Sequence, residues 1–178
     1  MEVLIKKINQ LKQAAQPSNF IVEVMRNDKL KQLIINLNAG KPGSTLPTSQ
    51  LFALGVNSKG IRLENIGGGH PATGIYAPNT IEGVKGQYKG KKELGLPYDR
   101  ITLYSSGEFY ESFKVSVLTK GRDAEIIITA DPTKEGTNLY QDWGEDIIGL
   151  TEENKEIFIS EFKSYLINFI KSEISKNI

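Results

Sequence analysis

Two short runs of residues with alternating side chains, separated by a turn, restrict the fold of this chain more than any other feature. Residues 113–117 alternate apolar with polar side chains, as a strand with one buried face does. Residues 120–123 have the composition of a hairpin turn, and residues 124–130 return as a second strand rich in isoleucine. We therefore predict an antiparallel β-hairpin over 113–130.

Helical patterns are expected near both ends of the chain. Residues 1–16 carry apolar side chains at helical spacing, and Pro17 stops that pattern. Residues 20–25 continue as a second helix, for which Ser18 or Asn19 can act as the N-cap. Thr151 has the composition of an N-cap for a long C-terminal helix, because two carboxylates follow in the first turn, where the helix dipole favours them.

The C-terminal helix is predicted to have a wide apolar surface. Its large apolar side chains cover roughly 200° of the helix circumference, whereas an ordinary single stripe covers about 100°. We therefore expect this helix to contact a second apolar surface. That surface is either a neighbouring subunit or this chain itself, with the helix between the sheet and the N-terminal helix, and the sequence leaves both open. The apolar residues are Phe158, Ile159, Phe162, Tyr165, Leu166, Phe169, Ile170 and Ile174.

Shorter elements are expected between these helices and the hairpin. Residues 33–38 fit either the end of the second helix, stopped by Gly40, or a short strand, and their β-branched centre slightly favours the strand. The remaining expectations are a loop at 41–44, a short helix at 49–54 capped by Thr48 and closed by Gly55, a turn at 57–60, strands at 61–63 and 101–104, a helical turn at 108–111, and a short helix at 137–143 that ends at Gly144.

Residues 64–98 differ in composition from the rest of the chain. They contain eight glycines and three prolines, with few apolar runs between them. A compact domain rarely contains so long an irregular connection unless it has a function. We expect an extended loop or arm, with one helical turn between Thr80 and Lys92. The whole chain, 1–178, is then one α+β domain, in which a small antiparallel sheet is packed by the N-terminal helix and the long C-terminal helix.

The residue types argue against catalysis. There is no cysteine and one histidine, His70, so thiolate chemistry, disulfides and a histidine-rich metal site are excluded. His70 follows three glycines, 67–69, but a proline comes next instead of the Lys-Ser/Thr of a phosphate-binding loop. We interpret this segment as a linker and expect no catalytic residue, cofactor or bound metal. No apolar stretch is long enough to span a membrane or to act as a signal peptide.

Two charged clusters are alternative candidate sites. Lys85, Lys89, Lys91 and Lys92 surround Tyr88 without an acidic residue among them, which suggests phosphate or an acidic surface as a partner. The net charge of only +1 argues against a dedicated nucleic-acid binder. The acidic residues Asp142, Glu145 and Asp146 would support a metal-dependent hydrolase, which is the least favoured hypothesis because they lack the spacing of an EF-hand loop.

Three elements in the second half of the chain follow one another in an informative order. Residues 106–115 (SGEFYESFKV) precede the hairpin, 139–144 (LYQDWG) form the short helix, and 148–154 (IGLTEEN) open the last helix. Together with 95–103 (GLPYDRITL), they resemble the virion morphogenesis and tail-completion proteins of tailed phages. That family has a TG-x-L-x-x-S element before a hairpin, and an F-L-G-L-S/T-x-E-D/N element before the terminal helix. Ser106 stands where the family usually has threonine.

The resemblance implies a non-enzymatic structural subunit that forms a ring at the head–tail junction of a phage virion. Its partners would be copies of itself and other neck, portal or tail proteins, with weak DNA contact as an option and no membrane. The protein would be made in the host cytoplasm and found in the virion. The motif residues are Gly107, Phe109, Ser112, Gly149 and Leu150, with the glycines separating elements and Phe109 and Leu150 in the core.

Candidate interface residues follow from these patterns. Trp143, the single tryptophan, suits either a core position or an interface anchor, with the core slightly favoured. The other candidates are Phe158, Tyr165 and Phe169 on the C-terminal helix and Lys85, Lys89, Lys91 and Lys92 in the loop. The alternative function is a small nucleic-acid-associated accessory protein that uses the Lys85–Lys92 loop.

Overall fold

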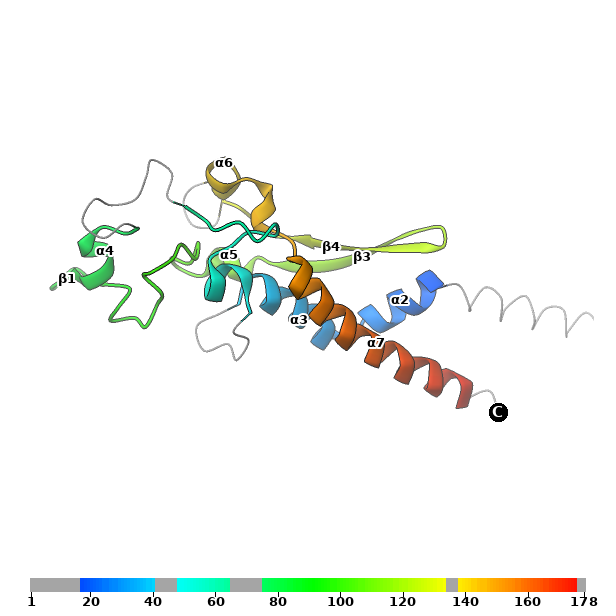
Figure 1. Ribbon diagram of the computed structural model, residues 1–178. Coiled ribbons are helices and arrows are strands. Elements are labelled where there is room, and N and C mark those ends of the chain that lie inside the picture. Colours follow the sequence, from blue (N-terminus) through cyan, green and yellow to red (C-terminus); the bar gives the residue numbers. More distant parts are fainter. Residues whose placement is uncertain (1–16, 41–47, 65–74, 134–137, 176–178) are drawn as a thin grey trace, which may run out of the picture.

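The structure, a computed structural model, describes residues 17–40, 48–64, 75–133 and 138–175. Within these ranges the chain has the α+β fold that the sequence predicts, with helices and two small antiparallel sheets (Figure 1). The helix expected at 1–16, the loop expected at 41–44, His70 and the glycines at 67–69 lie outside the described residues.

The predicted hairpin is confirmed, but its first strand starts one residue later and ends three residues later than expected, and its second strand starts and ends one residue earlier. Strand β3 spans Lys114–Lys120, strand β4 spans Asp123–Thr129, and a two-residue loop joins them. The register pairs Lys120 with Asp123 beside the loop and Lys114 with Thr129 at the other end. Gly121 occupies this loop with φ +63°, as a tight hairpin turn requires. The hairpin extends away from the centre of an elongated molecule (Figure 1).

Three helices cover one face of this hairpin. Helix α2 (Pro17–Met25) crosses both strands, α3 (Asp28–Asn38) lies against β3, and α7 (Glu152–Ser175) packs on α2 and α3. Helix α2 begins at Pro17 itself, so the expected cap at Ser18 or Asn19 is wrong. The Ser18 hydroxyl instead donates a hydrogen bond to the Gly121 carbonyl at 3.2 Å and so ties the helix to the hairpin turn.

The favoured strand at 33–38 is also wrong, because this segment is the second half of α3. Asn27 caps the helix by accepting a hydrogen bond from the Lys29 N–H at 2.9 Å. Leu30, Ile34 and Leu37 are each at most 1% exposed and lie at helical spacing. Burial of this stripe in the core outweighs the weak preference of β-branched residues for strands.

The buried residues form two clusters. The cluster under the hairpin joins α2, α3 and α7, and consists of Val24, Met25, Leu30, Ile34, Leu37, Leu150 and Phe158. The other lies in the middle of the molecule and holds Ala39, Leu51, Leu63, Ile101, Leu103, Phe109, Tyr110, Phe113, Leu139 and Ile147. Short helices surround the second cluster: η1 (Gln50–Leu54), α5 (Glu108–Glu111), α6 (Leu139–Trp143) and η2 (Glu145–Ile147).

Several short elements are confirmed with changed caps. Helix η1 has Ser49 and not Thr48 as its cap, since the Ser49 hydroxyl accepts from the Ala53 N–H at 3.1 Å, and Gly55 ends it with φ +66°. Helix α5 forms as expected at 108–111, and α6 ends at Gly144. The turn at 57–60 is present, but the strand expected at 61–63 is reduced to one bridge between Val56 and Arg62.

The strand expected at 101–104 does not form in the described structure. Ile101, Thr102 and Leu103 are buried, but they belong to neither sheet. Leu103 has φ +53°, which breaks the extended conformation. The Thr102 carbonyl accepts a hydrogen bond from the Tyr110 hydroxyl, and so a side chain replaces the missing strand partner.

Residues 75–98 contain more structure than the expected arm. Helix α4 (Pro78–Glu82) leads into β1 (Gly83–Val84) and β2 (Tyr88–Lys89), a second two-stranded hairpin. These elements lie at the opposite end of the molecule from the tip of the long hairpin (Figure 1). Backbone hydrogen bonds from Lys91 to Thr80 and from Lys92 to Ile81 close this unit on itself.

Candidate assembly interface

Helix α7 divides its apolar residues between two faces. Phe158 is buried, and Phe162, Tyr165 and Phe169 are partly buried against the cluster that α2 and α3 form. Phe169 also meets Phe20 edge to face at a centroid distance of 5.9 Å. Three of the candidate interface residues, Phe158, Tyr165 and Phe169, are therefore used inside the chain. Burial on the chain's own helices accounts for this half of the wide apolar surface.

The other half of the apolar surface on α7 faces solvent. Ile159, Ile167 and Ile170 are 46%, 51% and 37% exposed. At 100° per residue they fall in one sector of the helix, displaced from the buried face by roughly 100° or more. We call these three residues the isoleucine stripe. An exposed apolar stripe beside a buried one is typical of a helix that also contacts a partner.

The long hairpin also leaves polar backbone groups without strand partners. In the described residues, β3 and β4 pair with each other and with no third strand. Each strand is therefore an edge, along which every second residue turns its N–H and C=O away from the hairpin. An isolated two-stranded hairpin is marginal in water, and here the helices on its inner face provide the missing support.

The two faces of the hairpin differ in the expected way. Val115, Val117, Ile126 and Ile128 point toward the helices and pack on the buried cluster. The opposite face carries polar and charged residues together with two apolar ones, Leu118, which is 45% exposed, and Ile127, which is partly exposed. The alternation predicted from the sequence therefore sets which face meets the helices.

An apolar groove lies between β4 and the first turns of α7. It has a volume of about 360 Å³. Its lining residues are Ile34, Ile126, Ile128, Ile148, Gly149, Leu150, Lys155, Phe158 and Ile159. Ile159 belongs both to this groove and to the isoleucine stripe, so the free edge of β4, the groove and the stripe form one continuous surface.

A network of buried amides fixes the segment that enters α7. The Asn154 side-chain amide donates to the carbonyls of Leu37 at 3.0 Å and Thr48 at 2.9 Å. The Gln50 side chain donates to the Gly149 carbonyl at 2.8 Å and accepts from the Thr151 N–H at 2.9 Å. This network joins α3, η1 and α7, which places the isoleucine stripe relative to the hairpin.

The motif residues before α7 belong to the same network. Gly149 has φ +118°, and its N–H donates to the Asn38 side chain at 3.1 Å. Leu150 is buried in the cluster beneath the hairpin. Thr151 caps α7, since its hydroxyl accepts from the Asn154 N–H at 3.3 Å. Gly149 therefore separates two elements and Leu150 lies in the core, the positions that the family resemblance implies for them.

The motif residues before the hairpin hold α5 against β3 and β4. Gly107 has φ +93°, and a Cβ added there would lie 2.9 Å from the Tyr104 hydroxyl. Phe109 is fully buried and meets Phe113 edge to face at 5.2 Å. The Ser112 hydroxyl donates to the Phe109 carbonyl at 2.6 Å and accepts from the Asp131 N–H at 2.8 Å. Ser112 thus connects the start of the hairpin to its end.

Trp143 is packed within its own chain. Its ring lies against the central cluster, and the indole N–H donates to the Glu64 carbonyl at 3.1 Å. This partly buried position fits the core alternative, and the interface role for Trp143 stays a prediction.

The lysines of the 85–92 loop have different environments, and only Lys85 and Lys89 line the same surface depression. Lys89 pairs with Glu93 at 2.9 Å and Lys92 with Glu82 at 3.2 Å. The Lys91 ammonium donates to the Tyr104 carbonyl at 3.2 Å, and it lies 4.7 Å from the centre of the Tyr76 ring. Lys91 therefore anchors the α4–β2 unit to the centre of the molecule. Burial of this phenol raises the pKa of Tyr76 above its ordinary value.

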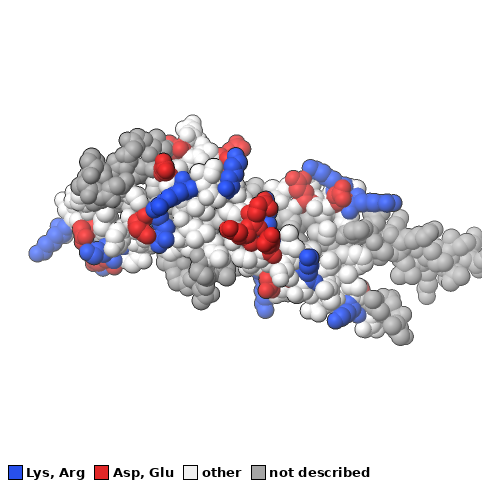
Figure 2. Space-filling model, in the orientation of Figure 1, with Lys and Arg blue, Asp and Glu red and all other residues white. Residues whose placement is uncertain are grey.

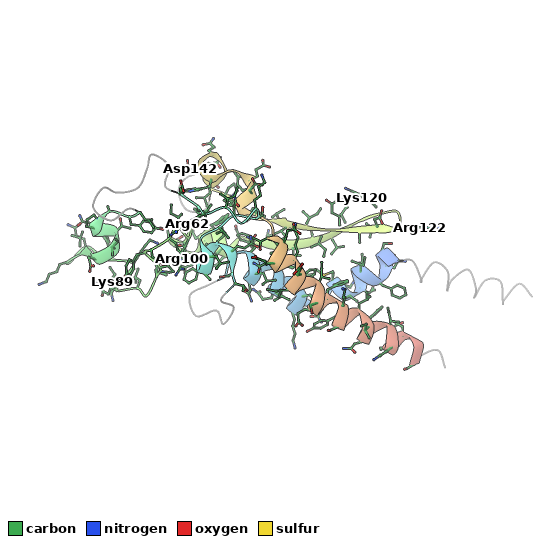
Figure 3. All side chains as sticks on the ribbon, viewed as in Figure 1. Arg62, Lys89, Arg100, Lys120, Arg122 and Asp142 are labelled. Atoms are coloured by element: carbon green, nitrogen blue, oxygen red, sulfur yellow. The ribbon has the colours of Figure 1, made fainter. Side chains whose placement is uncertain are left out.

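Basic side chains are scattered over the described surface. Lys89 lies at one end of the molecule, and Lys120 and Arg122 lie at the tip of the long hairpin at the other end (Figure 3). The face drawn in Figure 2 shows separate small groups of both signs and no continuous basic tract. This distribution differs from the basic groove or stripe by which proteins follow a phosphate backbone.

The acidic residues around α6 and η2 do not converge. Asp146 pairs with Lys59 at 2.6 Å. Within the described ranges, no group of three or more histidine or carboxylate side chains is placed to hold a metal ion. Tyr140 lies beside this region, and its pKa is raised by burial and by the carboxylates of Glu145 and Asp131.

The groove and the small hairpin β1–β2 were not predicted from the sequence. Gly83 and Gly90 are the residues in the sequence that could have indicated this hairpin. The two backbones approach so closely there that a Cβ on Gly90 would lie 2.2 Å from the Gly83 nitrogen. The groove had no signal in the sequence, since it is lined by residues from three separate segments.

Comparison of the chain with protein-family models, with curated proteins and with solved structures finds no match. None of the helices in the described residues is both long enough and apolar enough to cross a membrane.

Proposed function

We propose that this chain is a non-enzymatic structural subunit of a phage virion, and that its copies form a ring at the head–tail junction as part of the neck or of tail completion. The observation that carries the assembly role is the continuous surface formed by the β4 edge, the apolar groove and the isoleucine stripe. A small chain that leaves such a surface open beside a well-packed core is built for contact with another protein chain.

The position in a phage neck rests on the motif residues and their packing. Gly107, Phe109 and Ser112 hold the start of the hairpin, and Gly149 and Leu150 set the start of α7. Gly149 and Leu150 line the groove, and Ser112 binds the backbone just after β4, so the motifs that resemble the tail-completion family support parts of the fold next to the proposed interface. Self, neck, portal or tail proteins are the proposed partners, and the virion is the proposed location.

Two measurements test this proposal. The purified full-length chain, analysed by light scattering at increasing concentration, should form one discrete oligomer that appears ring-shaped in negative-stain electron microscopy. An antibody against the chain should label purified virions at the junction of head and tail. A chain that stays monomeric at millimolar concentration and is missing from virions would contradict the proposal.

A further inference from the structure

The two edges of the long hairpin carry opposite charges. Strand β3 carries Lys114 and Lys120 and no acidic residue, whereas β4 carries Asp123 and Glu125 and no basic residue. All four side chains are exposed. The two strands already form one ion pair within the hairpin, because the Lys120 ammonium on β3 lies 2.6 Å from a Glu125 carboxylate oxygen on β4. The hairpin therefore has one basic strand and one acidic strand, each open along its outer edge.

This charge pattern distinguishes three ways in which copies could pair their strands. If two β3 strands paired antiparallel about Val117, Lys114 of each copy would lie directly opposite Lys120 of the other copy. Two β4 strands paired about Ile126 would place the two Glu125 carboxylates diagonally across the interface. A β4 strand paired with β3 of the next copy, in the hairpin's own register, would place Lys120 of that copy opposite Asp123 and diagonal to Glu125. Only this last pairing brings opposite charges together.

The groove beside β4 favours the same arrangement. It lies on the inner face, next to the strand edge that would receive the neighbour. When a strand is added to a sheet edge, backbone hydrogen bonds supply affinity, and pockets beside the edge receive alternate side chains. Ile126 and Ile128, which line the groove, alternate along β4 on the face where those side chains would point.

We propose that the neighbour bound at this surface is a second copy of the chain, joined head to tail, with β3 of one copy pairing with β4 of the next. The contact is heterologous, because each copy uses a basic edge on one side and an acidic edge on the other. Such contacts close into rings when their rotation allows it. This inference rests on the proposed function, and it names the interface that the ring would use.

Charge reversal tests the pairing without assuming its register. One variant carries Lys114→Glu and Lys120→Glu, and the other carries Asp123→Lys and Glu125→Lys. Each variant has two edges of the same sign, so neither should form the oligomer by itself. Mixed in equal amounts, they should recover it, because each then supplies the sign that the other lacks. Within each variant, β3 and β4 repel each other because they carry the same sign, and mixing the two variants does not change this. Recovery of the oligomer in the mixture would therefore come from pairing between chains and not from a repaired fold.

The outcomes separate the two proposals. If the wild-type chain assembles and either variant assembles equally well alone, or if the mixture fails to assemble, the edge pairing is wrong while the proposed function stands. If the wild-type chain does not assemble at all, the edge pairing is wrong, and the antibody labelling of virions then decides whether the proposed function stands. Circular dichroism of each variant checks that it is folded.

Cysteine crosslinking provides a second measurement if a reversed variant does not fold. The natural chain has no cysteine, and Ser116 and Ile127 lie opposite each other in the hairpin register. Chains with Ser116→Cys alone and with Ile127→Cys alone, mixed under mild oxidation, should form a disulfide-linked dimer at least tenfold faster than either chain by itself. Equal rates in the mixture and in the separate samples would overturn the head-to-tail pairing.

Discussion

At the scale of single residues, buried amide side chains hold the centre of this molecule together. Asn154 is 2% exposed and Gln50 fully buried, although both are polar. Their burial is tolerated because each amide finds partners in segments that are distant in sequence, such as the carbonyl of Leu37. Apolar side chains could fill this space, but they could not align α3, η1 and the start of α7 by directional contacts.

Asn154→Leu should therefore destabilise the fold. The leucine removes the donor for two backbone carbonyls and leaves them buried without it, so the free energy of unfolding should fall by about 2–4 kcal/mol. Asn168→Leu is the matched control, because Asn168 is exposed on the same helix, and it should change stability by less than about 0.5 kcal/mol. Urea unfolding followed by circular dichroism measures both, and equal losses would show that the network contributes little.

Gly107 provides a test of the motif before the hairpin. Gly107→Ala combines an unfavourable φ of +93° with a Cβ only 2.9 Å from the Tyr104 hydroxyl. We expect a loss of about 2–4 kcal/mol in the free energy of unfolding. Gly60→Ala has a similar φ of +73° but open space around its Cβ, so it should lose only about 1–2 kcal/mol. Thermal unfolding of the two variants separates the clash from the backbone strain, and a smaller loss at Gly107 would contradict this explanation.

At the scale of elements, α7 combines two roles on one helix. Its aromatic side chains bury against α2 and α3, and its isoleucine stripe stays in solvent. The two alternatives that the sequence left open therefore apply to different halves of the same surface. Packing within the chain explains the aromatic half, and a neighbouring subunit is our proposal for the isoleucine half.

Ile167→Glu should separate these roles. Ile167 is 51% exposed and lies outside the buried cluster, so the change should alter stability by less than about 0.5 kcal/mol. If the stripe contacts a neighbour, the oligomer should weaken at least tenfold, because a carboxylate would be buried in an apolar contact. Ser164→Glu adds the same charge to an exposed position elsewhere on α7 and should leave assembly intact. Light scattering across a concentration series reports both, and unchanged assembly of the Ile167 variant would remove the stripe from the interface.

At the scale of the whole molecule, the charge distribution suits contact between proteins. The net charge is +1, and basic groups are separated along an elongated shape (Figures 2 and 3). Association through local pairs of opposite charge does not require a strong field of one sign. The Lys85–Lys92 loop, the basis of the nucleic-acid alternative, uses Lys91 for internal packing and pairs Lys89 and Lys92 with carboxylates.

We expect only weak DNA binding by this chain. Fluorescence anisotropy with a labelled duplex should show a dissociation constant of about 100 µM or more at 150 mM salt, at or beyond the weak end of non-specific binding. Replacing Lys85 and Lys89 by glutamate should change this value less than threefold. A tight complex that weakens steeply with salt and is lost in the double variant would favour the accessory-protein function instead.

The sequence by itself determined the elements whose evidence is a regular period. The hairpin over β3 and β4 alternates every second residue, and α7 repeats every three to four residues after a capped start. Such periods record which face of an element is buried, and they need no knowledge of the partner. The α+β class and the end of α6 at Gly144 followed from the same local information, whereas the separating role of Gly149 came from the family resemblance.

Tertiary structure decided everything that depends on which segments meet. Residues 33–38 became helical because Ile34 and Leu37 bury together, and residues 101–104 stayed outside both sheets because side chains satisfy their backbone. Lys91 donates to the Tyr104 carbonyl and lies beside the Tyr76 ring, and neither contact could be inferred from the residues next to Lys91 in the sequence. The groove and the exposed isoleucine stripe exist only once separate segments pack, since solvent exposure is a property of the folded surface and cannot be read from local order.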